Sequence, residues 1–293
     1  MVAVRDISFV TTTYNDALFL PRLIRSIANS TDRPHKCVIV NDGSDQKKSN
    51  AIFSELRAVG PHQTIELVET HNLGLASARN LGIDRTNSKY IRFIDADDYL
   101  AAGSTDLLIR TIEKSESDVA IGNYNLWNEG SNKIEWPARN NSDISNLQWR
   151  DLTVMWELLY TIPIHSALFR NIDIRFPDGF KSKEDWVLWS QVSKLGRLEV
   201  TPQSVCTYIL HENNMTKARD IRTCIHWIHA FLYINENVRI FKKSEREKML
   251  VHFLKTYWDR IDQTVFLSLI KQSASMNRDE KFLVSVLEEF GLI

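Results

Sequence analysis

The chain has 293 residues, 43% of them hydrophobic and 25% charged, with a formal net charge of −1. This size and composition predict a globular protein with one large domain and an appendage, or with two domains. The balance of 36 basic and 37 acidic residues gives no overall charge that attracts nucleic acid, so we expect no nucleic-acid partner. The three cysteines are an odd number without CxxC spacing, which favours buried reduced thiols over disulfides or a zinc site.

The first 120 residues alternate strand and helix patterns. Apolar, β-branched segments predict five strands, at Ile7–Thr13, Cys37–Val40, Ile65–Glu69, Tyr90–Ile94 and Val119–Tyr124. Helical spacing of apolar residues predicts helices between them, over Leu18–Ile27, to about Gly60, over Leu75–Asp84 and over Leu107–Glu116. Short βα connections of this kind imply an α/β fold with a doubly wound, mostly parallel sheet and helices on both faces.

The second half is less regular. A polar stretch from Asn128 to Asn146 predicts a loop or hairpin over the site. The patterns then predict a helix at Gln148–Tyr160, a strand at His165–Phe169, a helix at Asp185–Leu195 and a strand at Val205–Leu210. After Thr216 the pattern is helical to the end, over Ile221–Ile240, Glu245–Gln272 and Arg278–Phe290.

The most informative segment is the apolar strand that runs into Asp95-Ala96-Asp97-Asp98. Carboxylates this close repel one another unless a hard divalent cation shares their charge, so Mg²⁺ or Mn²⁺ is expected here. Such ions take one or two protein carboxylates and fill their remaining positions with water and substrate phosphates, which indicates a nucleotide diphosphate. The alternative is a solvated acidic turn that caps the helix starting near Gly103.

Polar clusters follow all four of the first strands. They are Tyr14-Asn15-Asp16, Asn41-Asp42-Gly43-Ser44, His71-Asn72-Leu73-Gly74 and Asp95–Asp98. Each is compatible with an ordinary turn or helix cap. A parallel sheet would bring all four to one edge, where ligands bind in such folds, so a shared site is the better interpretation.

Five motifs occur in order along about residues 5–216: ISFVTTTYND, VIVNDGS, LGLASARNLGI, FIDADD and KSKEDWVLW. Together they resemble the family-two glycosyltransferases of the GT-A fold, which transfer sugars from nucleotide donors. Two positions depart from the family pattern. Thr12 stands where proline is usual, and Lys183 stands where glycine is common. The segment after Thr216 resembles nothing we can name.

The resemblance, with the chemistry of the side chains, implies a donor site. Tyr14 offers a flat face for a nucleobase, and Asp42 can accept a hydrogen bond from a base N–H. Arg79 can hold the base or a phosphate through paired donors, although a surface arginine beside Asp84 is the alternative. In the family the first acid of the DxD pattern meets the ribose, which implies Asp95. The resemblance also includes Thr12 and Ala96 among the donor-binding positions.

For the metal, the resemblance implies Asp97 as the anchoring carboxylate, while Asp98 caps the following segment. His211 follows a predicted strand and is expected to contact the diphosphate or the metal; a structural histidine is the alternative.

Glu184 and Asp185 open a predicted helix, where acids are favoured by the helix dipole alone. The resemblance places the catalytic base here, at Asp185, with Glu184 orienting the acceptor. Transfer with inversion needs a base on the face opposite the leaving group, which takes the proton of the acceptor hydroxyl as that hydroxyl attacks.

These expectations combine into a metal-dependent, inverting glycosyltransferase that moves a hexosyl or N-acetylhexosaminyl group. The donor is expected to be a UDP-sugar and the acceptor a hydroxyl of a glycan or lipid-linked glycan, in bacterial surface polysaccharide synthesis. The alternatives are a sugar-nucleotidyltransferase, which normally has a glycine-rich loop where this chain has Thr12-Thr13-Tyr14-Asn15, and an inactive nucleotide- or glycan-binding module.

The expected organisation is a glycosyltransferase domain at 1–216 and a helical extension at 217–293. Within the first, residues to about 120 form the nucleotide-binding half, and residues 121–216 form the acceptor-binding half. No signal peptide or membrane span is expected, which predicts a cytoplasmic protein, free or at the inner face of the membrane. The extension is aromatic and partly basic, so self-association, peripheral membrane docking or contact with another domain of a longer enzyme is expected of it.

Overall fold

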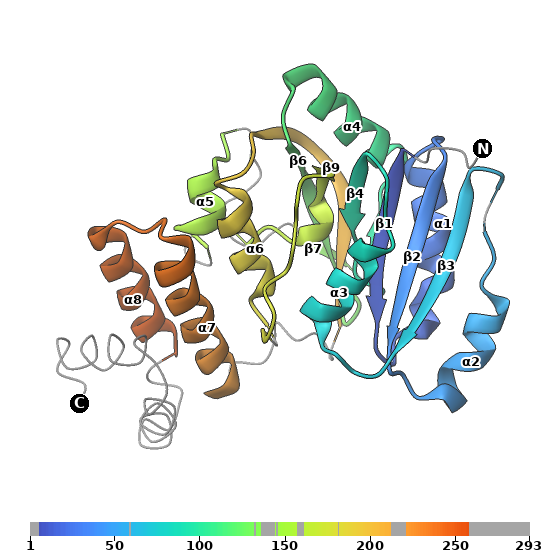
Figure 1. Cartoon of the computed structure of the whole chain (residues 1–293), viewed down its shortest axis with the longest axis horizontal. Helices are drawn as coiled ribbons and strands as arrows, with labels where there is room; N and C mark the ends of the chain where they lie inside the picture. Colours follow the sequence, from blue (N-terminus) through green and yellow to red (C-terminus); the bar gives the residue numbers. More distant parts are fainter. Residues whose placement is uncertain are drawn as a thin grey trace. The chain divides into compact units, whose positions relative to one another are not determined.

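The computed structural model describes residues 6–257 apart from 59, 132, 136–143, 145, 157–160, 181 and 212–220. The chain divides into two compact units, Met1–Asn214 and Met215–Ile293 (Figure 1). The functions expected of the two parts, and of the two halves of the first, stay predictions.

The first unit is built on one sheet, whose order is β3-β2-β1-β4-β8-β6-β9-β5 with β7 beside β6. The strands are β1 (Ile7–Thr13), β2 (His35–Asp42), β3 (Gln63–Thr70), β4 (Tyr90–Phe93), β5 (Tyr99–Leu100), β6 (Val119–Asn128), β7 (Lys133–Glu135), β8 (Ala167–Arg170) and β9 (Leu198–Leu210). The four strands from β3 to β4 are parallel, as are β6 and β9. β8 is antiparallel to β4 and β6, and β5 is antiparallel to β9. The predicted α/β fold is confirmed.

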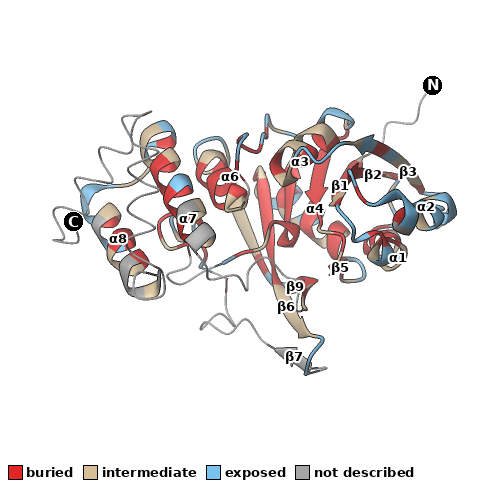
Figure 2. Cartoon of the chain, turned by 90° about the horizontal axis from the view of Figure 1, so that it is seen from below, coloured by how far each residue is buried: buried red, intermediate tan, exposed pale blue. Residues whose placement is uncertain are grey.

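Helices connect these strands and cover both faces of the sheet. They are η1 (Ala17–Phe19), α1 (Leu20–Ser30), α2 (Gln46–Glu55), α3 (Leu75–Asp84), α4 (Ser104–Ser115), α5 (Trp149–Thr153), η2 (Ile164–Ser166) and α6 (Glu184–Val192). Because successive strand residues point to opposite faces, β2 serves two cores. Cys37 and Ile39 pack with α1 and α4, whereas Val38 and Val40 pack with α3. Figure 2 shows how thoroughly the central strands are buried.

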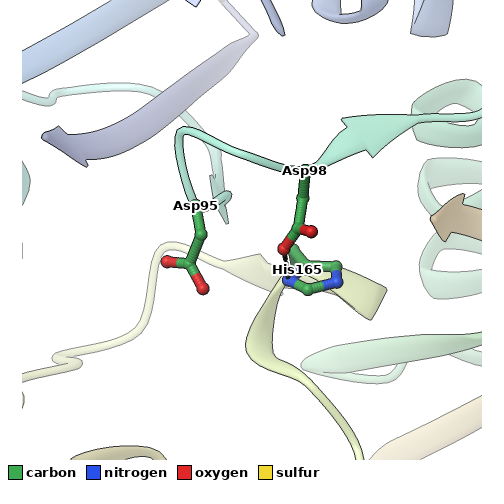
Figure 3. A group of neighbouring side chains, drawn as sticks. All are labelled: Asp95, Asp98 and His165. Carbon is green, nitrogen blue, oxygen red and sulfur yellow. Dashed lines mark ion pairs between the residues drawn. The ribbon is translucent and has the colours of Figure 1, made fainter. Parts of the chain in front are cut away.

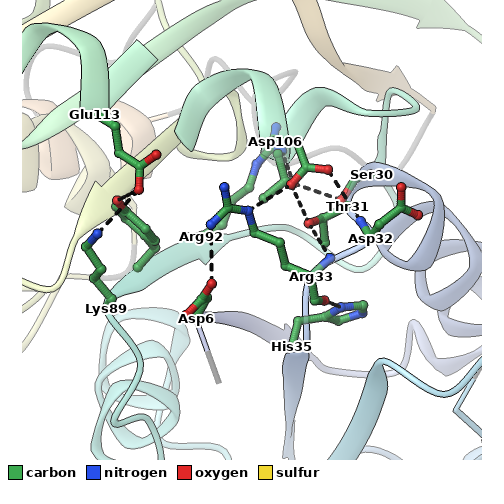
Figure 4. A network of polar contacts seen from close by, with 12 residues as sticks. Asp6, Ser30, Thr31, Asp32, Arg33, His35, Lys89, Arg92, Asp106 and Glu113 are labelled. Atoms are coloured by element: carbon green, nitrogen blue, oxygen red, sulfur yellow. Dashed lines mark hydrogen bonds and ion pairs between the residues drawn. The ribbon is translucent and has the colours of Figure 1, made fainter. Parts of the chain in front are cut away.

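A polar network fastens the end of α1 to α4 (Figure 4). Thr31 Oγ1 donates a hydrogen bond to Asp106 Oδ1 at 2.7 Å. Arg33 forms ion pairs with Asp6 at 3.2 Å and with Asp106 at 3.4 Å. These groups are partly exposed, so each contact contributes little alone, but together they fix where β2 begins.

Several predicted boundaries differ from the observed ones. The helix expected over Leu18–Ile27 begins at Leu20 instead, because the 3₁₀ turn η1 precedes α1; Leu18 lies in that turn and is 63% exposed, whereas Ala17 and Leu20 are buried. The helix expected at Gln148–Tyr160 is described only as α5, Trp149–Thr153, and 157–160 lie outside the described residues. β5 was not predicted, because two residues carry no periodicity.

The described part of the second unit contains α7 (Ile221–Tyr233), a π-helical turn, η4 (Ile234–Val238), and α8 (Lys243–Tyr257). Its core is aromatic: the ring of Trp227 stacks on Phe231 at 5.4 Å and on Phe253 at 4.9 Å between centroids. The helix predicted at Arg278–Phe290 lies outside the described residues. Among the residues that the structure describes, no helix is both long enough and apolar enough to cross a membrane.

Candidate active site

The carboxyl ends of β1 and β2 are tied together by side-chain contacts. The backbone N–H of Asn15 donates to Ser44 Oγ at 2.8 Å, and Asp45 N–H donates to Asn15 Oδ1 at 2.8 Å. Asn15 has a φ of 65°, a conformation that asparagine tolerates better than most residues. This turn leaves Tyr14 49% exposed, so its ring face is available for a base, while Thr12 is half-buried within β1.

Asp42 is buried at the end of β2 and organises the loop that follows β3. One carboxylate oxygen accepts from Leu73 N–H at 2.6 Å and the other from Gly74 N–H at 2.9 Å. The adjacent Gly43 has a φ of +82°, and a Cβ there would lie 2.8 Å from the backbone nitrogen of Asn72. Asp42 therefore holds the start of α3, and any contact with a base uses the remaining lone pairs of these oxygens.

Arg79 joins two acids from distant parts of the chain. Its guanidinium donates to Asp95 Oδ1 at 2.6 Å and to Glu184 Oε1 at 2.7 Å, and it lies 5.1 Å from the ring centroid of Phe176. Burial alone would lower the pKa of Arg79, but the two carboxylates outweigh it and raise the pKa above its usual value. The same contact leaves the pKa of Asp95 lowered despite its burial. Arg79 thus contacts two protein carboxylates, and its predicted role at a base or phosphate stays a prediction.

Asp97 and His211 form the second pair of the site. Asp97 Oδ2 lies 2.8 Å from His211 Nε2, and the two side chains are 21% and 16% exposed. Burial, and then the neighbouring Asp95, raise the pKa of Asp97, so this carboxylate lacks full compensation for its charge. One carboxylate oxygen and one imidazole nitrogen at a partly open edge fit a divalent cation that takes its other ligands from water and diphosphate, and the imidazole fits Mn²⁺ better than Mg²⁺.

A second group of possible metal ligands lies at the same turn, where Asp95, Asp98 and His165 offer three ligand atoms within 4.8 Å of one another (Figure 3). Asp98 is fully buried; one oxygen accepts from Ile209 N–H at 2.7 Å, and the other lies 3.2 Å from His165 Nδ1. Burial raises the pKa of Asp98 well above its usual value and lowers that of His165 to about 4. Asp98 and His165 are both buried, whereas a diphosphate must reach its metal from solvent, so the partly exposed pair of Asp97 and His211 fits such a metal better.

The base predicted at Asp185 sits in the first turn of α6. Its Oδ1 accepts a hydrogen bond from the backbone N–H of Trp186 at 2.8 Å. Burial and then the neighbouring Glu184 raise the pKa of Asp185 to about 7, which suits a group that must take a proton near neutral pH. Lys183, the residue directly before α6, has a φ of 67°, in the left-handed region, which gives a physical reason for the glycine common at this position.

The structure therefore brings Arg79, Asp95, Glu184 and Asp185 together and places Asp97 beside His211. Ala96, between the acids, is buried. The sequence interpretation missed His165, which carried no signal beyond its place in a predicted strand. It also missed Phe19, whose ring stacks on His211 with centroids 6.1 Å apart. The periodicity of the sequence does not indicate that Phe19 lies next to His211.

The chain was compared with known proteins. The sequence profile named Glycosyl transferase family 2 matches residues 8–177. An uncharacterized glycosyltransferase of Haemophilus influenzae is 24% identical over 97% of this chain and 84% of its own length. Glycosyltransferase GlyA of Streptococcus pneumoniae is 25% identical over 77% of this chain, and the minor teichoic acid biosynthesis protein GgaB of Bacillus subtilis is 23% identical over 94% of it. The match spans only 33% of the length of each of these last two proteins.

Solved structures share the fold. S. aureus TarS 1-349 in complex with UDP-GlcNAc superimposes with a TM-score of 0.61 at 18% identity, covering 87% of this chain and 73% of that one. The mannosyltransferase PcManGT from Pyrobaculum calidifontis, in complex with GDP-Man and Mn²⁺, gives 0.57 at 16% identity, covering 100% and 82%. The profile match extends over more than half of the chain, from β1 through the acidic turn to the segment before α6. The chain is a glycosyltransferase and belongs to glycosyl transferase family 2.

Proposed function

We propose that this glycosyltransferase is a metal-dependent, inverting enzyme that moves a sugar from a UDP-sugar to a hydroxyl of a glycan or lipid-linked glycan. The observation that carries the proposal is the Arg79 bridge, which holds Asp95, expected on the donor side, next to Glu184 and Asp185, expected on the acceptor side. Donor and acceptor would then meet at a single place, as a direct displacement requires.

On the donor side, Tyr14 would stack on the base and Asp95 would accept from the ribose. Thr12, Asp42 and Ala96 shape the same edge of the sheet. Asp97 and His211 would hold Mn²⁺, which when bound neutralises charge that develops on the departing diphosphate. A UDP-GlcNAc complex of TarS and a GDP-Man complex with Mn²⁺ of PcManGT support a nucleotide-sugar donor in this fold, without choosing the base.

On the acceptor side, Asp185 would take the proton of the attacking hydroxyl. Glu184 Oε1 accepts a hydrogen bond from Arg79 at 2.7 Å, which holds this side chain in place and suits it to orient the acceptor. The name of GgaB, a teichoic acid biosynthesis protein, supports a bacterial cell-surface glycan as the acceptor class. The second unit, residues 215–293, would serve self-association, docking to a membrane surface or contact with a further domain.

The donor is tested by thermal shift with UDP-, GDP-, CDP- and TDP-sugars, each with and without Mn²⁺. A ligand at a hundredfold excess over its Kd stabilises by about 2.7 kcal/mol, so the correct donor should stand out clearly. Stabilisation by UDP-sugars that needs Mn²⁺ supports the proposal. Stabilisation by UDP-sugars that is as large in EDTA as in Mn²⁺ would show that donor binding does not need the metal. Greater stabilisation by a sugar nucleotide with another base would overturn the UDP assignment.

Transfer itself is tested by UDP release from that donor in the presence of candidate glycan acceptors. Asp185→Asn serves as the matched control, since it should bind donor as the wild type does while releasing little UDP. Equal UDP release by the two proteins would show that Asp185 is not the base.

A further inference from the structure

The turn that carries Asp97 is held from outside by the helical segment after β1. Arg22 of α1 donates a hydrogen bond from Nη2 to the backbone oxygen of Asp97. One turn further along α1, Ser26 Oγ accepts from the backbone N–H of Leu100 at 3.2 Å. The acidic turn is therefore anchored to α1 on both sides of Asp98.

His211 is held by the same segment. The ring of Phe19 lies against the imidazole with centroids 6.1 Å apart and an interplanar angle of 30°. The guanidinium of Arg22 lies 5.6 Å from the centroid of Phe19 and 5.6 Å from that of Tyr99. Stacked rings at such separations favour particular relative orientations, and a cation over two rings reinforces both contacts.

The platform beneath these contacts is rigid. Leu20, Leu23 and Ile27 of α1 are fully buried in the main core, and Pro21 fixes the first turn of the helix. Arg22 thus projects from a helix that is anchored in the core, and Phe19 is the residue directly before that helix. Leu18, directly beside Phe19, is 63% exposed.

We propose that Phe19 and Arg22 are positioning residues that hold His211 and Asp97 at the spacing a divalent cation requires. Phe19 fixes the plane of the imidazole, and Arg22 fixes the backbone of the carboxylate and the ring of Phe19. Groups that orient metal ligands typically change metal affinity by about 10- to 100-fold when removed. The inference rests on the proposed function, because it assumes that this pair binds the metal.

Phe19 gives the cleaner test, because its replacement changes no charge. Mn²⁺ affinity is measured by EPR titration of free Mn²⁺, with and without UDP, on Phe19→Ala, Phe19→Tyr and Leu18→Ala. Phe19→Ala should weaken Mn²⁺ binding by about three- to tenfold, because the loosely stacked ring contributes less than a direct ligand contact. Phe19→Tyr should bind as the wild type does, and so should Leu18→Ala, which removes an exposed apolar side chain next to Phe19.

Replacement of Arg22 gives a second test, because the two possible roles of this residue change Mn²⁺ affinity in opposite directions. Loss of a positive charge near a cation site should by itself strengthen Mn²⁺ binding, whereas loss of the anchor should weaken it. Arg22→Met should therefore bind Mn²⁺ more weakly if positioning dominates, with partial recovery in Arg22→Lys. Arg25→Met, one turn along α1 at an exposed position, is the matched control for the loss of one arginine.

The outcomes separate the two proposals. If the wild type does not bind Mn²⁺, the metal of the proposed function is wrong. If the wild type binds Mn²⁺ but Phe19→Ala binds equally well, or Arg22→Met binds more tightly, only the positioning role is wrong. Thermal unfolding of each variant shows whether the fold is intact; a Phe19→Ala protein with wild-type Tm and weakened Mn²⁺ binding upholds the inference.

Discussion

Asp97 and His211 are 114 positions apart in the sequence, yet Asp97 Oδ2 lies 2.8 Å from His211 Nε2. β5 pairs with β9 immediately after the acidic turn, with Tyr99 opposite Thr207 and Leu100 opposite Cys206. That short ladder carries the end of β9 to the turn. The two side chains that we assign to the metal are thus brought together by a strand pair of two residues.

Replacement of Asp97 by alanine should abolish Mn²⁺-dependent binding of UDP, because the cation loses its carboxylate anchor and the diphosphate loses its counter-charge. Calorimetry of UDP binding in the presence of Mn²⁺ measures this, with metal-free buffer as the control. Affinity equal to that of the wild type would move the metal site to Asp95, Asp98 or elsewhere.

Asp185→Asn should leave UDP and Mn²⁺ affinity nearly intact and lower kcat by about 10²–10⁴, because the amide keeps the shape but cannot accept the proton. Glu184→Gln should cost less in kcat and more in acceptor KM. Steady-state kinetics of both variants with a working acceptor distinguish the two roles, and the reverse pattern would make Glu184 the base.

The pH dependence of transfer should follow Asp185. Its pKa is raised to about 7, so kcat/KM should fall as pH drops below about 7, where the carboxyl group becomes protonated. The positive charge of Lys183 lowers that pKa. Lys183→Gln should therefore move the acid limb of the profile to higher pH, and an unmoved limb would assign it to another group.

The same aspartate should cost stability at neutral pH. Its pKa is near 3.8 when unfolded and about 7 when folded, so the folded protein binds the extra proton between these values. The free energy of unfolding then falls as pH rises through this interval. At pH 8 the free energy of unfolding of Asp185→Asn should exceed that of the wild type by an amount on the order of 1–3 kcal/mol, whereas near pH 4 the two should differ little. A stability difference that stays constant across this pH range would argue against a raised pKa of Asp185.

The parallel half of the fold was predictable because its strands are continuous apolar runs and its helices are periodic. β1 and α3 have the predicted bounds, Ile7–Thr13 and Leu75–Asp84. The pairing in the antiparallel half was not predictable from the sequence. β8 lies between β4 and β6, and this placement depends on contacts between distant segments that no local pattern contains.

Prediction of the site had the same limit. The motifs pointed to Arg79, Asp95 and Asp185, but they could not show that Arg79 contacts Glu184, 105 positions away. Asp98 was expected to cap the following segment; its carboxylate instead accepts a hydrogen bond from Ile209 N–H, a partner that no local sequence pattern indicates.

The Arg79 bridge has a consequence for mutational studies of this enzyme. Asp95 and Glu184 both form ion pairs with the guanidinium of Arg79. Removal of either acid leaves Arg79 paired with the other carboxylate alone, which changes the electrostatic potential at that remaining acid. Single substitutions at these positions therefore do not report independent contributions, and their free-energy effects should not add. A double-mutant cycle of Asp95 and Glu184 would measure this coupling directly.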